Sequence, residues 1–174
     1  MDAIKFKKLL FKTAFCCIAC DGHIDDREVA EMKYLDKNTS YFGDTDLSKE
    51  LDTLIEDLKT KGKHIVFELF EEIKNSDISF VQELLLLEIT FRLINSDEKV
   101  DDNEVKFLKL LRSYLKVYDE IIIERFGQVN LLFDKKYYST FKTSDQTKEF
   151  FDGLTLPELK DITKIDFSKF DAKQ

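Results

Sequence analysis

The chain has 174 residues, of which 43% are hydrophobic, and this composition predicts one globular domain with a continuous buried core. Its formal net charge is −8 and its isoelectric point is near 4.9. Both values argue against nucleic-acid or anionic-membrane binding as the main task, because either task needs a basic surface. Cations or basic proteins are the better candidates for a partner.

No apolar run approaches the roughly 20 residues that a membrane-spanning helix needs. The apolar residues near the N-terminus are interrupted by four lysines at amphipathic spacing, and the run 81–94 carries three charges. We therefore expect a cytoplasmic protein with no direct membrane insertion. Three cysteines crowd into one helical turn, which fits a reducing compartment and predicts buried small side chains: Cys16, Cys17 and Cys20.

Apolar residues recur at helical spacing along most of the chain, and no stretch alternates convincingly as a strand. The expected helices cover 3–20, 26–37, 47–58, 64–74, 79–94, 105–117 and 119–126, with a further short helix starting at Thr155. The pattern predicts an all-α, single helical domain of about seven to eight helices. We expect the domain to cover 1–130, with 131–174 as a C-terminal extension packed on it.

One acid-rich segment occurs twice. The sequence DGHIDDREV at 21–29 returns as DEKVDDNEV at 97–105, and apolar positions on both sides match at the same offset of 76 residues. The repeating unit is a helix, an acidic turn and a second helix. Two such units predict an internal pseudo-twofold arrangement within one domain, because a solenoid would need at least three.

Helix capping accounts for part of each acidic segment. The residues 25–28 and 101–104 have the capping-box pattern, in which an N-cap Asp accepts from backbone amides and a Glu three residues later reaches back. Carboxylates in the first turn also suit the helix dipole. A purely structural reading, in which the acids are caps on an interaction protein, therefore stays open.

Capping does not account for Asp21 and Asp97. Each follows the C-terminal end of an apolar helix, where unsatisfied carbonyls disfavour a carboxylate. A hard divalent cation would compensate, because it attracts both kinds of oxygen, and Gly22 permits a tight turn in the first copy. Two three-acid sites are predicted, one in each copy: Asp21, Asp25 and Glu28, then Asp97, Asp101 and Glu104.

The predicted ion is Ca²⁺ in the first place, with Mg²⁺, Mn²⁺ and Zn²⁺ as alternatives. Binding should be weak, because the front half of an EF-hand loop is missing: Cys17 and Ala19 stand where its first two ligands would be. His23 could add a nitrogen ligand, although a solvated turn residue is the simpler interpretation. His64 is expected at the surface, at the start of a helix.

A helix ending in Ala-Cys-Asp-Gly-x-Ile, and a second unit ending in Ile-Asn-Ser-Asp-x-x-Val-Asp-Asp-x-Glu, resemble the TerB family of tellurite-resistance and stress-response proteins. The resemblance covers roughly 5–126. It implies an all-helical fold and divalent-metal binding by Asp21 and Glu28, and by Asp97 and Glu104, with Asp25 and Asp101 supporting. Glu98 departs from the pattern, because it stands where the family has Gly.

We therefore expect a non-catalytic, divalent-cation-binding module in a stress response, or a protein-interaction scaffold. Its partner would be an unidentified protein, which could belong to a membrane-associated complex. A metal-dependent hydrolase is a third alternative, and it requires the two acidic turns to converge on one cleft. No bound cofactor other than the cation is expected, because the sequence lacks a glycine-rich phosphate loop.

Overall fold

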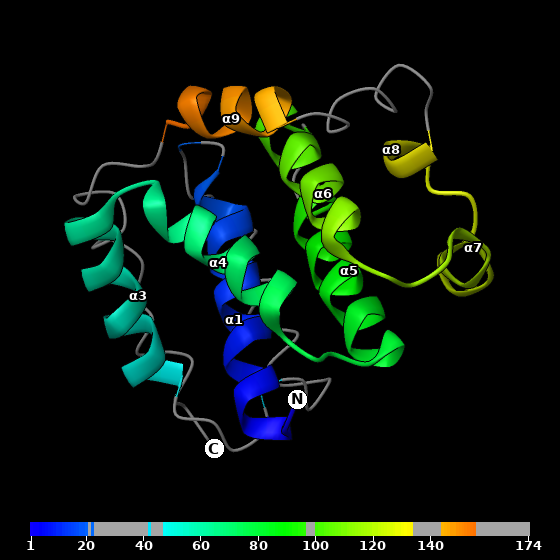
Figure 1. Cartoon of the computed structure of the whole chain (residues 1–174), viewed down its shortest axis with the longest axis horizontal. Helices are drawn as coiled ribbons and strands as arrows, with labels where there is room; N and C mark the ends of the chain where they lie inside the picture. The colour runs from blue at the N-terminus through cyan, green and yellow to red at the C-terminus, as the bar shows by residue number, and fades with distance from the viewer. Residues whose placement is uncertain (21, 23–41, 43–46, 97–99, 134–143, 156–174) are drawn as a thin grey trace.

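The computed structural model describes residues 1–20, 22, 42, 47–96, 100–133 and 144–155, and all regular structure in these ranges is helical (Figure 1). The helices are α1 (Ala3–Ala19), α3 (Leu47–Lys61), α4 (His64–Asn75), α5 (Phe80–Ile94), α6 (Asp102–Tyr114), α7 (Asp119–Phe126), α8 (Asn130–Phe133) and α9 (Ser144–Gly153). This confirms the all-α prediction. The helix predicted at 26–37 and the one predicted to follow Thr155 lie outside the described residues.

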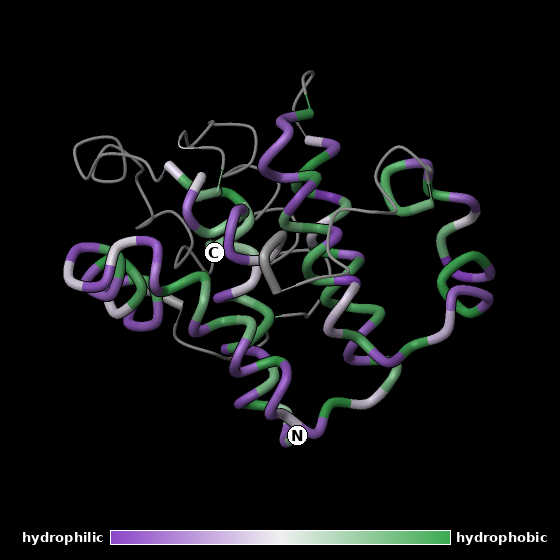
Figure 2. Tube along the Cα trace, turned by 45° about the horizontal axis from the view of Figure 1, so that its top comes forward, coloured by the Kyte–Doolittle hydropathy of each residue, from purple (hydrophilic) through white to green (hydrophobic). Residues whose placement is uncertain are grey.

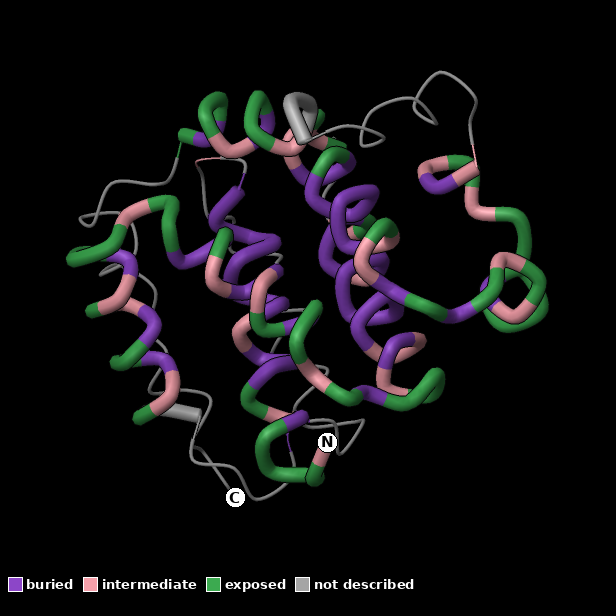
Figure 3. Tube along the Cα trace, viewed as in Figure 1, coloured by how far each residue is buried: buried purple, intermediate pink, exposed green. Residues whose placement is uncertain are grey.

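Helix α1 runs through the middle of the molecule and packs against α3, α4, α5 and α6 (Figure 1). It starts where Asp2 acts as N-cap, with its carboxylate accepting from the amide of Lys5 at 3.0 Å. Almost every residue from Leu9 to its end is buried, so its second half has no solvent-facing side (Figure 3). The core is therefore built around the helix that leads into the first acidic turn.

Helix α5 is the other central element, and it packs against α1 and α6. Ser79 and Gln82 form a capping box at its start, so the helix begins one residue later than the predicted 79. Glu83 is only 1% exposed, and its carboxylate accepts from the amides of Lys116 and Val117, the first at 2.8 Å. A buried acid of α5 thus holds the connection between α6 and α7.

Helices α3 and α4 form the side of the bundle next to α1. Gly62 turns the chain between them with a φ of +55°, a left-handed conformation that favours glycine. Hydrophobic and hydrophilic residues alternate along α3 (Figure 2), and its apolar residues at helical spacing are buried: Leu51, Leu54 and Leu58. The helix continues to Lys61, three residues past the apolar pattern.

Helix α9 lies across one end of the bundle, above α4 and α6 (Figure 1). Phe150 and Leu154 belong to the main core, with 5% and 7% exposure. The sequence pattern does not predict this helix, because Phe150 is the one residue described as buried within it and gives little periodic signal. Helix α6 starts at 102 and not at 105, since its first turn is the polar capping sequence, and it ends before the buried Val117.

None of the helices in the described ranges is both long enough and apolar enough to cross a membrane.

Candidate functional site

The second acidic turn opens α6 with a capping box. Asp101 is the N-cap, and its carboxylate accepts from the amide of Asn103 at 2.7 Å. Glu104 closes the box by accepting from the amide of Asp101 at 3.0 Å. The capping interpretation of Asp101 and Glu104 is therefore confirmed, and it satisfies amides that a helix start would otherwise leave unpaired.

These two acids present only oxygen ligands, which is the chemistry that Ca²⁺ and Mg²⁺ prefer. Their oxygens are less available to an ion than those of a solvated loop would be. Glu104 is only 2% exposed, and one of its oxygens already accepts the hydrogen bond of the capping box. Asp101 is half-buried. A cation at this turn would have to share carboxylates that the helix start uses.

The end of α5, just before Asp97, is closed by side-chain donors. The amide group of Asn95 donates to the carbonyl of Phe91 at 2.6 Å, and the hydroxyl of Ser96 donates to the carbonyl of Leu93 at 2.7 Å. Two of the last carbonyls of α5 are thus bonded without an ion. This weakens the reason for a cation in the second copy.

The first acidic turn is built differently. Helix α1 ends at Ala19, and the amide of Gly22 donates to the Ala19 carbonyl at 3.3 Å. Gly22 has a φ of +80°, and a Cβ placed there would lie 2.7 Å from the backbone carbonyl oxygen of Thr155. Only glycine fits this backbone without a shift of the Leu154–Thr155 segment. The turn therefore touches the chain that follows α9.

Most of the predicted ligands fall outside the part of the chain that the structure describes: Asp21, Asp25, Glu28 and Asp97. His23 and Glu98 lie there as well. Among the described residues there is no group of three His, Cys, Asp or Glu side chains that could hold a metal ion. The structure thus places Asp101 and Glu104 together and leaves the rest of both predicted sites as predictions.

The cysteines of α1 are buried thiols, as predicted. Cys16, Cys17 and Cys20 are all 0% exposed, and none of them is in a disulfide. Burial raises the pKa of the Cys16 thiol from 9.0 to about 12, and the nearby Lys12 ammonium only partly opposes this. Such a thiol is protonated and inert at neutral pH, so it suits packing and not redox chemistry.

A charged cluster between α5 and α7 has a structural role. Glu88 accepts from Arg92 at 3.3 Å and from Arg125 at 3.0 Å, and a shallow cavity of about 340 Å³ lies beside these side chains. Both guanidinium groups contact the Glu88 carboxylate. The cluster fastens α7 to the bundle through the contact between Arg125 and Glu88.

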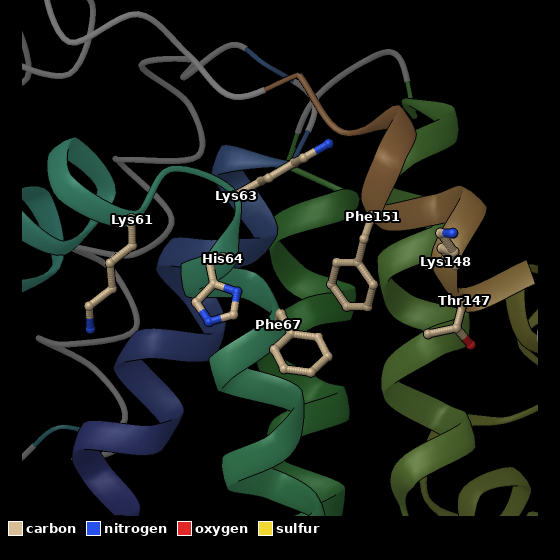
Figure 4. A pocket seen from close by; sticks show the side chains of 7 residues that line it. All are labelled: Lys61, Lys63, His64, Phe67, Thr147, Lys148 and Phe151. Carbon is tan, nitrogen blue, oxygen red and sulfur yellow. The ribbon is translucent and has the colours of Figure 1, made fainter. Parts of the chain in front are cut away.

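A larger cavity, which the sequence pattern does not predict, lies between the start of α4 and α9. It has a volume of about 440 Å³ and is lined by aromatic and basic side chains (Figure 4). His64 is at its edge, exposed at the first position of α4, as predicted. The sequence feature that points to this cavity is Phe67, an aromatic residue on the polar side of an otherwise amphipathic helix. In the structure Phe67 is 42% exposed.

No protein-family model, curated protein or solved structure matches the chain.

Proposed function

We propose that the chain is a TerB-like, non-catalytic helical module that binds a divalent cation weakly through its acidic turns. One observation carries this proposal. Helix α1 ends at Ala19 and α5 ends at Ile94, so the duplicated acids Asp21 and Asp97 directly follow two central helix ends. A carboxylate next to the negative end of a helix needs a compensating positive charge.

The first turn is the stronger site in this proposal. Gly22 supplies a left-handed turn there, whereas the second copy has Glu98 in the equivalent position. The second copy also has Asn95 and Ser96 bonded to the carbonyls of α5, while alanine and cysteine stand at the matching positions of the first copy. The retained Gly22 turn is the observation that favours the first copy.

The cation is most simply Ca²⁺. The predicted ligands are carboxylate oxygens, and Ca²⁺ accepts irregular oxygen geometry and completes its shell with water. Three acids per turn are fewer than an EF-hand provides, so we expect binding in the millimolar range or slightly tighter. The bound module would then act through a protein partner in a stress response.

A second candidate is a purely structural role for the acids, on a helical interaction protein without metal. The capping box formed by Asp101 and Glu104 favours it, because each of these carboxylates already has backbone donors. The two candidates differ at Asp21. A cap has no use for a carboxylate at that position, whereas a cation does.

Titration of the ¹⁵N-labelled protein with Ca²⁺, Mg²⁺, Mn²⁺ and Zn²⁺ tests the proposal by NMR. Ca²⁺ should shift the amide resonances of 21–28 at lower concentration than those of 97–104. Asp102→Asn is a matched control, because Asp102 is an exposed acid in the first turn of α6 outside both predicted ligand sets. If millimolar metal shifts neither turn, the cation proposal is wrong and the structural role remains.

A further inference from the structure

The cavity between α4 and α9 combines aromatic walls with positive charge. Its aromatic side is formed by His64 and Phe67 of α4 and by Phe151 of α9, which point toward one another in Figure 4. Three lysines stand around these rings: Lys61, Lys63 and Lys148. None of the described lining residues is acidic, although the whole chain carries a net charge of −8. The charged side chains that line the cavity are therefore positive, in a chain whose net charge is negative.

The aromatic side is fixed by the core behind it. Phe67 stacks on His64 with ring centroids 5.3 Å apart and meets Phe151 edge-on at 5.6 Å. Phe151 in turn contacts the fully buried Phe70 at 6.1 Å. These rings are therefore held in place before any ligand arrives, so little conformational entropy would be lost on binding.

The three lysines are not equivalent. The Lys61 ammonium pairs with Asp57 at 3.1 Å and with Glu68 at 2.9 Å, so carboxylates already balance its charge. Lys63 donates to the backbone carbonyl of Asp152 at 3.0 Å, and a neutral carbonyl leaves its positive charge in place. Lys148 is exposed at the α9 side of the cavity.

The start of α4 adds to this charge. Lys63 occupies the N-cap position of this twelve-residue helix, and no side chain caps it. The positive end of the helix dipole and the ammonium of Lys63 therefore fall on the same edge of the cavity. An anionic group placed there would meet Lys63 and, from the other side, Lys148. The amides of Ile65 and Val66 already donate to the carbonyls of Gly62 and Lys63, so the lysines and the helix dipole would supply the attraction.

We propose that this cavity binds a small aromatic anion, meaning a flat apolar ring system that carries one carboxylate, sulfonate or phosphate group. The ring would lie against Phe67 and Phe151, and the anionic group would face Lys63 and Lys148. A volume of about 440 Å³ holds a bicyclic ligand and lies within the range of small-molecule sites. This site is independent of the acidic turns and of any cation.

The test uses three naphthalene probes of equal ring size and different charge: 1-naphthoate, 1-naphthalenemethanol and 1-naphthylmethylammonium. Titrations of the full chain are followed by NMR. We expect saturable binding of the naphthoate, with the neutral alcohol about fivefold weaker and the cation weaker still. In the wild-type complex, nuclear Overhauser effects should connect the naphthoate ring to Phe67 and Phe151.

Two variants separate the ring from the charge. Phe67→Ala should weaken naphthoate binding about tenfold, and Lys63→Gln combined with Lys148→Gln should remove the preference for the anion while leaving the alcohol unchanged. Matched controls are Phe80→Ala, which removes an equally exposed ring from α5, and Lys106→Gln on α6.

Equal affinity for all three probes, or ring contacts elsewhere in the wild-type protein, would overturn the proposal. Failure to saturate at any accessible naphthoate concentration would overturn it too. These outcomes rest on the wild-type protein, so they hold even if a substitution disturbs folding.

Discussion

The ends of α1 and α5 carry the same duplicated acidic motif, yet the chain closes them in different ways. After α5, Asn95 and Ser96 bond the last carbonyls through their side chains. After α1, Gly22 bonds the Ala19 carbonyl through its amide and adopts a left-handed conformation against Thr155. The same acidic motif therefore follows two helix ends whose carbonyls are bonded by different groups.

The described acids of the second copy have a defined structural role. In the second copy, Asp101 and Glu104 serve the start of α6. In the first copy, the tight turn at Gly22 is retained, and the chain after α9 lies on top of it. The described contacts therefore differ between the two copies: helix capping in the second and a glycine turn packed on Thr155 in the first.

The largest effect is expected at Gly22. Gly22→Ala should lower the free energy of unfolding by about 2 to 4 kcal/mol, because alanine is strained at this positive φ and its Cβ would meet the Thr155 carbonyl. Chemical denaturation measures the change. Gly62→Ala is the control, since Gly62 also has a positive φ but open space around it, and about 1 kcal/mol is expected there. Equal losses would mean that the contact with Thr155 contributes nothing.

The cap of the second turn should have an intermediate effect. Asp101→Ala should cost about 1 kcal/mol, because the first amides of α6 lose their acceptor. Asp101→Asn keeps a side-chain oxygen in place and should cost a few tenths of a kcal/mol at most. A loss on thermal unfolding that is the same for both variants would show that the charge matters and not the hydrogen bond.

The end of α5 should be less sensitive. Asn95→Ala removes one donor to the Phe91 carbonyl, and since Asn95 is exposed, water can replace it at a cost of about 0.5 kcal/mol. The more informative readout is metal affinity. If Asn95 competes with a cation for the end of α5, the variant should bind Ca²⁺ at 97–104 more tightly than the wild type does. Unchanged affinity would speak against that competition.

The smallest effect at neutral pH is expected from ionisation of the cysteine thiols, which only the first copy has. Because the pKa of Cys16 is raised to about 12 in the folded state from 9.0, only the unfolded thiol ionises between these values. Its contribution to stability is complete below pH 9 and is lost as the pH rises toward 12. Cys16→Ala should flatten that decline, and the native thiols should resist alkylation at pH 8. Rapid alkylation of the folded protein would contradict their burial.

Periodicity was sufficient to predict the central helices, because α1, α4, α5 and α6 bury most of an apolar stripe or nearly all of their surface. It failed for α9, because Phe150 and, just after the helix, Leu154 pack in a core formed by residues far away in the sequence. Boundaries shifted where capping residues stand, as at Ser79, since a cap is polar and lies outside the helix it starts.

For the sites, the residue pattern predicted the capping box at Asp101 and Glu104, because that bond is local and spans three residues. It gave no warning that Gly22 touches Thr155, or that Phe67 meets Phe151, because both pairs are far apart along the chain. Long-range contacts such as these require the three-dimensional arrangement. The remaining predicted ligands, Asp21, Asp25, Glu28 and Asp97, stay predictions.

Thermal unfolding of Asp21→Asn and Asp97→Asn, each with and without Ca²⁺, tests the central claim most directly. At a Ca²⁺ concentration roughly ten times the dissociation constant, the wild type should gain about 1.4 kcal/mol of stability. Asp21→Asn should lose most of this gain while keeping its metal-free stability, whereas Asp97→Asn should keep most of the gain. A wild type that Ca²⁺ does not stabilise, or a loss confined to Asp97→Asn, would contradict a cation site at the first acidic turn.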